Sequence, residues 1–263
     1  MDLPGGDEMH RIIQQRTCAR FEMKEEILQE YKTRGRIKLE TFIDINDEDY
    51  KHPILYWIER CLNCSSTDLH FSVYSAEVDR VKTILARLSR EKNTQKMNKL
   101  DKSGRTALSV SILLRNKEIV DSILDTRGID VNVKDKIGVA PIHYASQLGM
   151  RRTIHTMLEK KNGDVNIIDP DGTSPLMLAC AHSQLTVVDC LIMHQGNPDQ
   201  KDKWGWNSLF YAVYGNGETK IQNAKVFQRI LDEGVDKDVK DTRGMRAIDL
   251  AGHLNKGDLV SLI

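Results

Sequence analysis

The feature that most restricts the fold is a four-residue segment, Asp-x-x-Gly, that recurs along residues 101–263. It begins at Asp101, Asp135, Asp169, Asp202 and Asp241. An apolar residue follows each Asp by seven places, and the intervals between these apolar residues are 34, 34, 33 and 39. A period of this length indicates a repeat architecture in which each unit packs on its neighbours.

Each unit has the pattern of two short helices joined by a tight turn. Three places after the apolar residue stands a small one: Ser111, Ala145, Ala179, Ala212 or Ala251. Further along, apolar residues at i, i+3 and i+4 mark one face of a second helix. One unit buries side chains worth ~10–20 kcal/mol, whereas ordering its residues costs about 50 kcal/mol. A single unit therefore cannot fold, and the units must stack.

The segment A-P-I-H-Y-A at 140–145 resembles the T-P-L-H-x-A core of the ankyrin repeat. This resemblance covers residues 101–263 and implies an all-α ankyrin solenoid whose helix pairs alternate with β-hairpin fingers. The expected units are 101–134, 135–168, 169–201, 202–240 and a truncated C-terminal repeat, 241–263. Residues 67–100 fit the same columns without the finger glycine and are interpreted as a degenerate first repeat. The extra length of 202–240 predicts a mobile, solvent-facing loop from Gly215 onward.

Residues 1–66 do not follow the period and are expected to form a helical, partly flexible N-terminal extension. Residues 8–31 and 53–62 have helical patterns, and the second of these segments is expected to cap the end of the stack. The pair Cys61 and Cys64 is a candidate for half of a zinc site, but no second C-x-x-C accompanies it. No metal site is therefore predicted.

Composition narrows the classes of function. The 38 basic and 38 acidic residues balance, so the net charge does not demand nucleic acid or an anionic membrane as partner. The first ten residues lack a secretory signal pattern, no apolar run is long enough to span a bilayer, and five cysteines suit a reducing compartment. An intracellular protein, cytoplasmic or nuclear, is expected. Residues 87–105 are rich in Arg and Lys, and this basic stretch leaves nucleic-acid or anionic-surface binding as an alternative.

No pattern of residues predicts catalysis. The sequence has no phosphate-binding loop, metalloprotease, serine-hydrolase or kinase motif, so we expect no enzyme, no catalytic residue and no cofactor. The resemblance implies that His143 hydrogen-bonds the backbone of the neighbouring finger. Cys180 and Cys190 lie on predicted helices and are expected to be buried as small hydrophobic residues. A role as the accessory domain of a larger enzyme stays open.

The predicted function is protein–protein interaction, as an adaptor, scaffold or regulatory subunit in signalling or transcription. The resemblance implies binding through finger tips and the concave face. The predicted contact residues, of which several are apolar and expected to be exposed, are Arg105, Ile137, Val139, Asp171, Trp204, Trp206, Tyr214, Arg243 and Met245.

Two asparagines carry a further, modification hypothesis. Asn132 and Asn166 each stand eight residues after a leucine, in D-V-N segments that look like sites of asparaginyl hydroxylation in other ankyrin fingers. The preferred interpretation is structural, because Asn in a turn commonly hydrogen-bonds the backbone.

Overall fold

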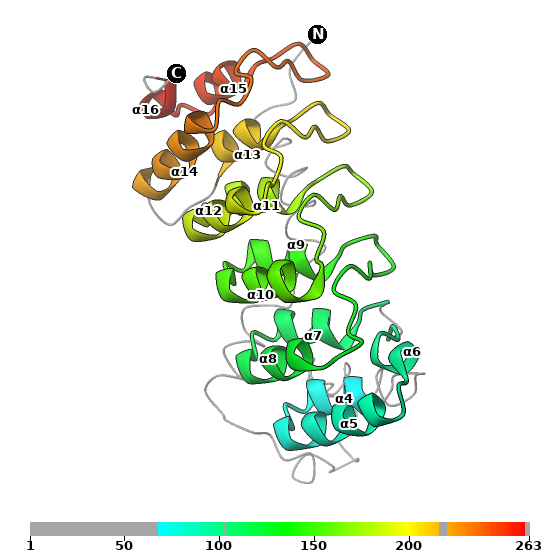
Figure 1. The fold of residues 1–263 in the computed structure, drawn as a ribbon. Coiled ribbons are helices and arrows are strands. Elements are labelled where there is room, and N and C mark those ends of the chain that lie inside the picture. Colours follow the sequence, from blue (N-terminus) through cyan, green and yellow to red (C-terminus); the bar gives the residue numbers. More distant parts are fainter. Residues whose placement is uncertain (1–67, 102–103, 216–219, 261–263) are drawn as a thin grey trace, which may run out of the picture.

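The computed structural model describes residues 68–101, 104–215 and 220–260 as a stack of helix pairs with finger turns projecting from one side (Figure 1). The predicted extension 1–66, the Cys61–Cys64 pair and the loop residues 216–219 lie outside the described residues. None of the described helices is both long and apolar enough to cross a membrane.

Each pair consists of a seven-residue inner helix and an outer helix. The inner helices are α4 (Asp68–Tyr74), α7 (Ala107–Leu113), α9 (Pro141–Gln147), α11 (Pro175–Ala181), α13 (Ser208–Tyr214) and α15 (Ala247–His253). The outer helices are α5 (Val78–Arg90), α8 (Lys117–Asp125), α10 (Arg151–Lys161), α12 (Leu185–Met193), α14 (Lys220–Asp232) and α16 (Gly257–Val260). A short helix, α6 (Thr94–Met97), follows α5.

The inner helices begin where the sequence supplies a cap. The hydroxyl of Thr106 accepts a hydrogen bond from the backbone N–H of Ser109 at 3.1 Å, and Asn207 caps α13 in the same way. At α9 the cap comes from His143, whose Nδ1 accepts from the Ala140 N–H at 3.2 Å. Its Nε2 lies 3.1 Å from the carbonyl of Thr173 in the next finger. The structural role expected for His143 is confirmed.

The core runs continuously through the stack. Every residue of α7 and of α11 is buried. Each of these two helices packs against the inner helices of both neighbouring repeats and against the outer helix of its own repeat. The small residues at Ala145, Ala179 and Ala212 are fully buried at these close contacts. Neighbouring units thus share one core, as the stacking argument requires.

The recurring Asp holds each finger turn together. In the second finger, Oδ1 of Asp135 accepts hydrogen bonds from the N–H groups of Ile137 (3.0 Å) and Val139 (2.9 Å), and Asp202 does the same for Trp204 and Trp206. The Gly of the motif adopts a left-handed conformation, with φ of +83° at Gly172. The motif therefore encodes a turn whose backbone donors are satisfied from within.

The fingers are tight, short hairpin turns. The backbone N–H of Asp135 donates to the carbonyl of Val139 at 2.9 Å and closes the second finger. Among the described residues the fingers contain no extended strand pair, only one isolated bridge between Lys240 and Arg246. The loop expected from Gly215 onward falls on residues 216–219, which lie outside the described residues, so it stays a prediction. Gly215 itself is buried, and α14 has 13 residues where α12 has 9.

Candidate protein-binding surface

Position within the finger decides whether a side chain faces the solvent. Two places after the finger Asp, the side chain of Ile137 is 41% exposed and that of Trp204 is half-buried. Four places after it, Val139 and Trp206 are only 2% and 3% exposed. In each of these fingers, the backbone N–H groups two and four places after the Asp donate to the same carboxylate oxygen. The chain therefore curls around the Asp and directs the residue four places after it into the stack.

Three of the predicted contact residues are therefore not exposed. Val139 and Trp206 occupy the inward finger position, and Tyr214, at the end of α13, is only 5% exposed. Beside Tyr214, Lys256 crosses over the end of α13 and donates hydrogen bonds to the carbonyls of Val213 (2.7 Å), Tyr214 (3.3 Å) and Gly215 (2.8 Å). The expectation that these three apolar side chains form part of an exposed strip was wrong.

The outward side chains of the third and fourth fingers are tied together by Lys203. Its ammonium lies 2.6 Å from Oδ1 of Asp171 and 4.3 Å from the ring centroid of Trp204. A cation over an indole face is attracted by the ring quadrupole. This contact and the ion pair hold Trp204 in a fixed orientation beside Asp171.

The apolar part of this surface includes a residue that sequence reasoning missed. Ile168, immediately before the third finger Asp, is 37% exposed, and its carbonyl accepts a hydrogen bond from Lys134 of the second finger at 2.8 Å. The position directly before the repeated Asp gives no consistent signal in the sequence, because it is Lys in three units and apolar in the other two. Together with Ile137 and Trp204, it spreads apolar area over the second, third and fourth fingers.

The predicted contact residues nearer the ends of the stack differ in their surroundings. Arg105 is half-buried, and its backbone N–H donates to Oδ1 of Asp101 at 2.8 Å. The Arg243 guanidinium pairs with Asp241 of its own finger at 3.0 Å. Burial favours the neutral Asp241 carboxyl, but hydrogen bonds from Met245, Arg243 and the Trp206 indole lower its pKa below the ordinary value. Met245 is half-buried.

On the inner helices, His182 is the polar side chain with the most unusual surroundings. It is the C-cap of α11 and is partly exposed, and its Nε2 is buried without a hydrogen-bond partner among the described residues. Burial lowers its pKa to about 4, so the imidazole is neutral at physiological pH. It is a neutral polar group on the inner side of the stack.

The two asparagines of the modification hypothesis form a ladder between finger turns. Nδ2 of Asn132 donates to the carbonyl of Asn162 (3.1 Å), and its Oδ1 accepts from the N–H of Asp164 (2.9 Å). Asn166 repeats this pattern with Gln195 (3.1 Å) and Asn197 (2.8 Å) in the next unit. These bonds support the structural interpretation, and hydroxylation at Asn132 or Asn166 stays a prediction.

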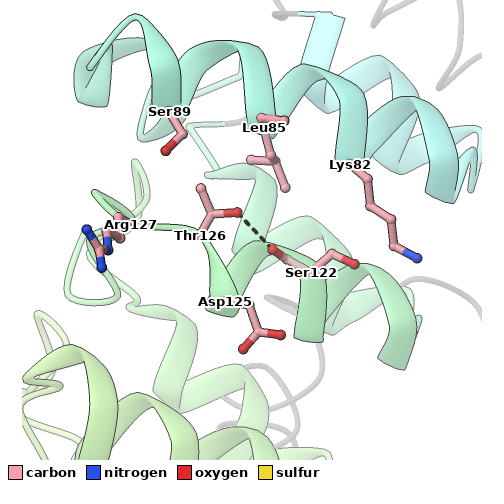
Figure 2. A pocket seen from close by; sticks show the side chains of 8 residues that line it. Lys82, Leu85, Ser89, Ser122, Asp125, Thr126 and Arg127 are labelled. Atoms are coloured by element: carbon pink, nitrogen blue, oxygen red, sulfur yellow. Dashed lines mark hydrogen bonds between the residues drawn. The ribbon is translucent and has the colours of Figure 1, made fainter.

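The outer side of the first two repeats carries the basic stretch and a shallow groove. Arg87, Arg90 and Lys96 are exposed, and Arg87 lies 3.6 Å from Asp68. The groove, of about 590 Å³, lies between α5 and α8 (Figure 2). Its lining includes Lys82, which pairs with Glu118 at 2.9 Å rather than with another lining residue. The charged residues that line the groove are Lys82, Asp125 and Arg127, so the lining carries both signs of charge.

Comparison with known proteins agrees with this geometry. A family model described as ankyrin repeats (3 copies) matches residues 142–241. The fold is similar to that of the ankyrin repeat protein EF0377, with 22% identity, 74% of this chain and 94% of that chain covered, and a TM-score of 0.65. It is similar to an ankyrin repeat domain (ABAYE2397) from Acinetobacter baumannii AYE, with 22% identity, coverage of 74% and 94%, and a TM-score of 0.64.

A third similar structure is the ankyrin repeat domain of Bcl-3, described as a unique member of the IkappaB protein family. Its identity is 17%, the coverage is 75% of this chain and 98% of that chain, and the TM-score is 0.56. No curated protein sequence gave a significant match. The stacked helix pairs and Asp-centred fingers define a helical repeat protein. Residues 142–241 match the ankyrin-repeat family model, and the described residues have the fold of an ankyrin-repeat solenoid.

Proposed function

We propose that this chain binds a partner protein through its second, third and fourth finger tips, as an adaptor, scaffold or regulatory subunit. Ankyrin repeats are generally protein–protein interaction modules, and the fold is typically non-catalytic. The observation that carries the proposal is the exposed apolar side chain of Ile137, 41% accessible at the tip of a rigid turn. Apolar area gathered at one place on a surface commonly marks a contact site.

The fingers favour binding because their conformation is fixed before a partner arrives. The carboxylates of Asp135 and Asp202 each hold two backbone N–H groups of their own turn, and backbone bonds such as Lys203 N–H to Asp171 C=O (2.8 Å) join neighbouring fingers. A surface that is already ordered loses little conformational entropy on association. The apolar centre of Ile137, Ile168 and Trp204, with Lys203 and Asp171 at its edge, resembles an interface core with a polar rim.

Site-specific photocrosslinking tests this assignment. We would place a photoreactive amino acid at position 137, and as a matched control at position 221, where Ile221 is 67% exposed on outer helix α14. A protein captured from position 137 and not from position 221 would then be purified, and its affinity for the chain measured.

The double variant Ile137→Ser/Trp204→Ala should weaken that affinity at least tenfold, equivalent to ~1.4 kcal/mol. The control Ile221→Ser should leave it unchanged. Equal affinities for the two variants would refute the finger-tip surface. A ligand that is nucleic acid, bound with a steep loss of affinity as salt rises, would instead favour the basic stretch 87–105 as the binding site.

We place this role inside the cell, in the cytoplasm or the nucleus. The support is that Cys180 and Cys190 are free, buried thiols and that the whole chain has five cysteines. Unpaired cysteines are typical of reducing compartments.

A further inference from the structure

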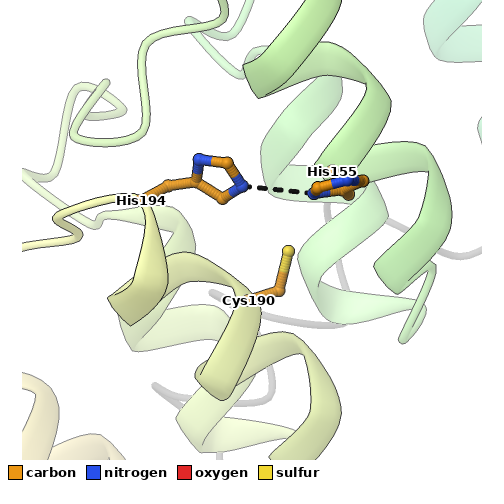
Figure 3. A group of neighbouring side chains, drawn as sticks. All are labelled: His155, Cys190 and His194. Atoms are coloured by element: carbon orange, nitrogen blue, oxygen red, sulfur yellow. Dashed lines mark hydrogen bonds between the residues drawn. The ribbon is translucent and has the colours of Figure 1, made fainter.

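Two pairs of metal-binding residue types face each other on the outer side of the stack. On α10, His155 and Glu159 are four residues apart, and on α12 and its C-terminal cap, Cys190 and His194 have the same spacing. Residues at i and i+4 lie on one face of a helix. Because α10 packs against α12, both pairs lie at the junction between two neighbouring repeats. Figure 3 shows His155, Cys190 and His194 at this junction.

The distances between donor atoms match those of a tetrahedral metal centre. Nδ1 of His155 lies 3.3 Å from Nε2 of His194, and Oε1 of Glu159 lies 3.5 Å from the same Nε2. The donor atoms of His155, Cys190 and His194 are all within 4.8 Å of one another. Two ligands bound at about 2.0–2.1 Å to a tetrahedral ion are ~3.3–3.4 Å apart, so the separation of the two nitrogens already fits. Their rings must turn out of the mutual hydrogen bond so that both lone pairs face the ion. The Cys190 sulfur, within 4.8 Å of both nitrogens, must come to the ~3.6 Å that this geometry requires.

We propose that His155, Glu159, Cys190 and His194 form a Zn²⁺-binding site that joins α10 to α12. Two imidazoles, a thiolate and a carboxylate are all ligands that Zn²⁺ accepts in tetrahedral sites. The thiolate and the imidazoles exclude Mg²⁺ and Ca²⁺, which prefer oxygen ligands. The thiolate and the carboxylate together carry two negative charges, which balance the charge of the ion.

The four proposed ligands combine one buried side chain with others that an ion can reach from the solvent. Cys190 is 2% exposed and anchors the cluster in the core, whereas His155 is exposed and leaves an entry path for the ion. Cys190 would bind Zn²⁺ as a thiolate, and its thiol proton would be released to the solvent.

The test uses the full chain, reduced and stripped of metal. Cys61→Ser and Cys64→Ser are introduced in this background so that the C-x-x-C pair cannot bind the ion. Co²⁺ is titrated as a spectroscopic probe and then displaced by Zn²⁺. We expect one equivalent of Co²⁺ to give the intense visible bands of a tetrahedral site, together with a thiolate-to-metal charge-transfer band. We expect Zn²⁺, and not Mg²⁺, to raise the melting temperature, because an ion that binds only the folded state stabilises it.

Variants identify the ligands. His155→Gln changes an exposed residue, so the fold should be intact by circular dichroism, while Zn²⁺ affinity should fall at least tenfold. Cys190→Ser should abolish the charge-transfer band, and His253→Gln, on exposed α15 surface, is the matched control that should change nothing. A weak octahedral Co²⁺ spectrum in the parent chain would overturn the proposal. So would unchanged Zn²⁺ affinity in both His155→Gln and His194→Gln.

Discussion

Replacing Trp206 with Ala should lower the free energy of unfolding of the C-terminal repeats more than a substitution at an outward finger position does. The indole is 3% exposed and stacks on Phe210 with ring centroids 5.5 Å apart. It meets Tyr211 edge-on at 5.8 Å, and its Nε1–H donates to Asp241 of the next finger at 3.3 Å. One side chain therefore links the fourth finger, its own inner helix and the fifth finger.

The expected loss follows from this burial. Removing a core aromatic side chain costs about 3–5 kcal/mol, and the missing indole donor leaves Asp241 with one hydrogen bond fewer. Trp206→Phe keeps most of the apolar area and loses only the N–H, so it should cost about 1–2 kcal/mol. Trp204→Ala is the matched control at the outward position. There the half-buried indole loses mainly its contact with Lys203, worth about 0.5–1 kcal/mol at a partly exposed site.

Urea unfolding followed by far-ultraviolet circular dichroism measures these differences, because the signal does not depend on the tryptophans themselves. We expect the order of stability to be parent, then Trp204→Ala, then Trp206→Phe, then Trp206→Ala. Since repeats unfold through their interfaces, the Trp206→Ala curve should also broaden as the last two units separate from the rest. If Trp204→Ala and Trp206→Ala lose equal free energy of unfolding, the distinction between inward and outward finger positions is wrong.

Three further predictions concern a finger turn, the partly exposed His182 and the asparagine ladder. Gly172→Ala should lower the urea midpoint more than Gly244→Ala. Both glycines have φ above +80°, which costs an alanine about 1 kcal/mol or more, but a Cβ at Gly172 would stand 3.0 Å from Cα of Asp202 and one at Gly244 would meet nothing; equal losses would contradict this. His182 has a folded pKa of about 4, below the 6.5 of the unfolded chain. Its contribution of about 3 kcal/mol is complete above pH 6.5 and disappears as the pH falls towards 4. His182→Gln should therefore reduce the change in free energy of unfolding between pH 6.5 and 4. An unchanged pH dependence in this variant would contradict the role assigned to His182. Asn166→Ala removes two hydrogen bonds to the next unit and should cost about 1–2 kcal/mol in urea unfolding, whereas a neutral effect would show that the ladder adds nothing.

The fold could be predicted from the sequence because its signals are redundant. The same column of small residues, from Ala145 to Ala251, recurs at the same phase as the apolar columns, and only stacked helix pairs bury all of them. The role of His143 was also predictable, since it rests on a family pattern of bonds to the next finger. Because the same pattern recurs in several repeats, it identifies the fold even where one repeat departs from it.

The exposure of individual finger residues could not be read in the same way. Trp204 and Trp206 flank the same glycine and look equivalent in the sequence. Their opposite orientations follow from how the Asp202 carboxylate binds both N–H groups, which pattern arguments had treated only as a turn signal. The zinc cluster was missed for a different reason. Each half is an ordinary i, i+4 pair on one helix, and only the packing of α10 on α12 brings His155 beside His194.

The zinc site and the finger surface act on the same pair of repeats. Helix α10 belongs to the unit whose finger presents Ile137, and α12 belongs to the unit whose finger presents Asp171. In a solenoid each unit contacts only its neighbours, so an ion that joins α10 to α12 restrains the angle between these two fingers and no others directly. A restrained angle lowers the ordering cost of binding at the finger tips. Because coupling between two binding events is reciprocal, a partner that binds across Ile137 and Asp171 should raise the affinity for zinc by the same factor by which zinc raises the affinity for the partner.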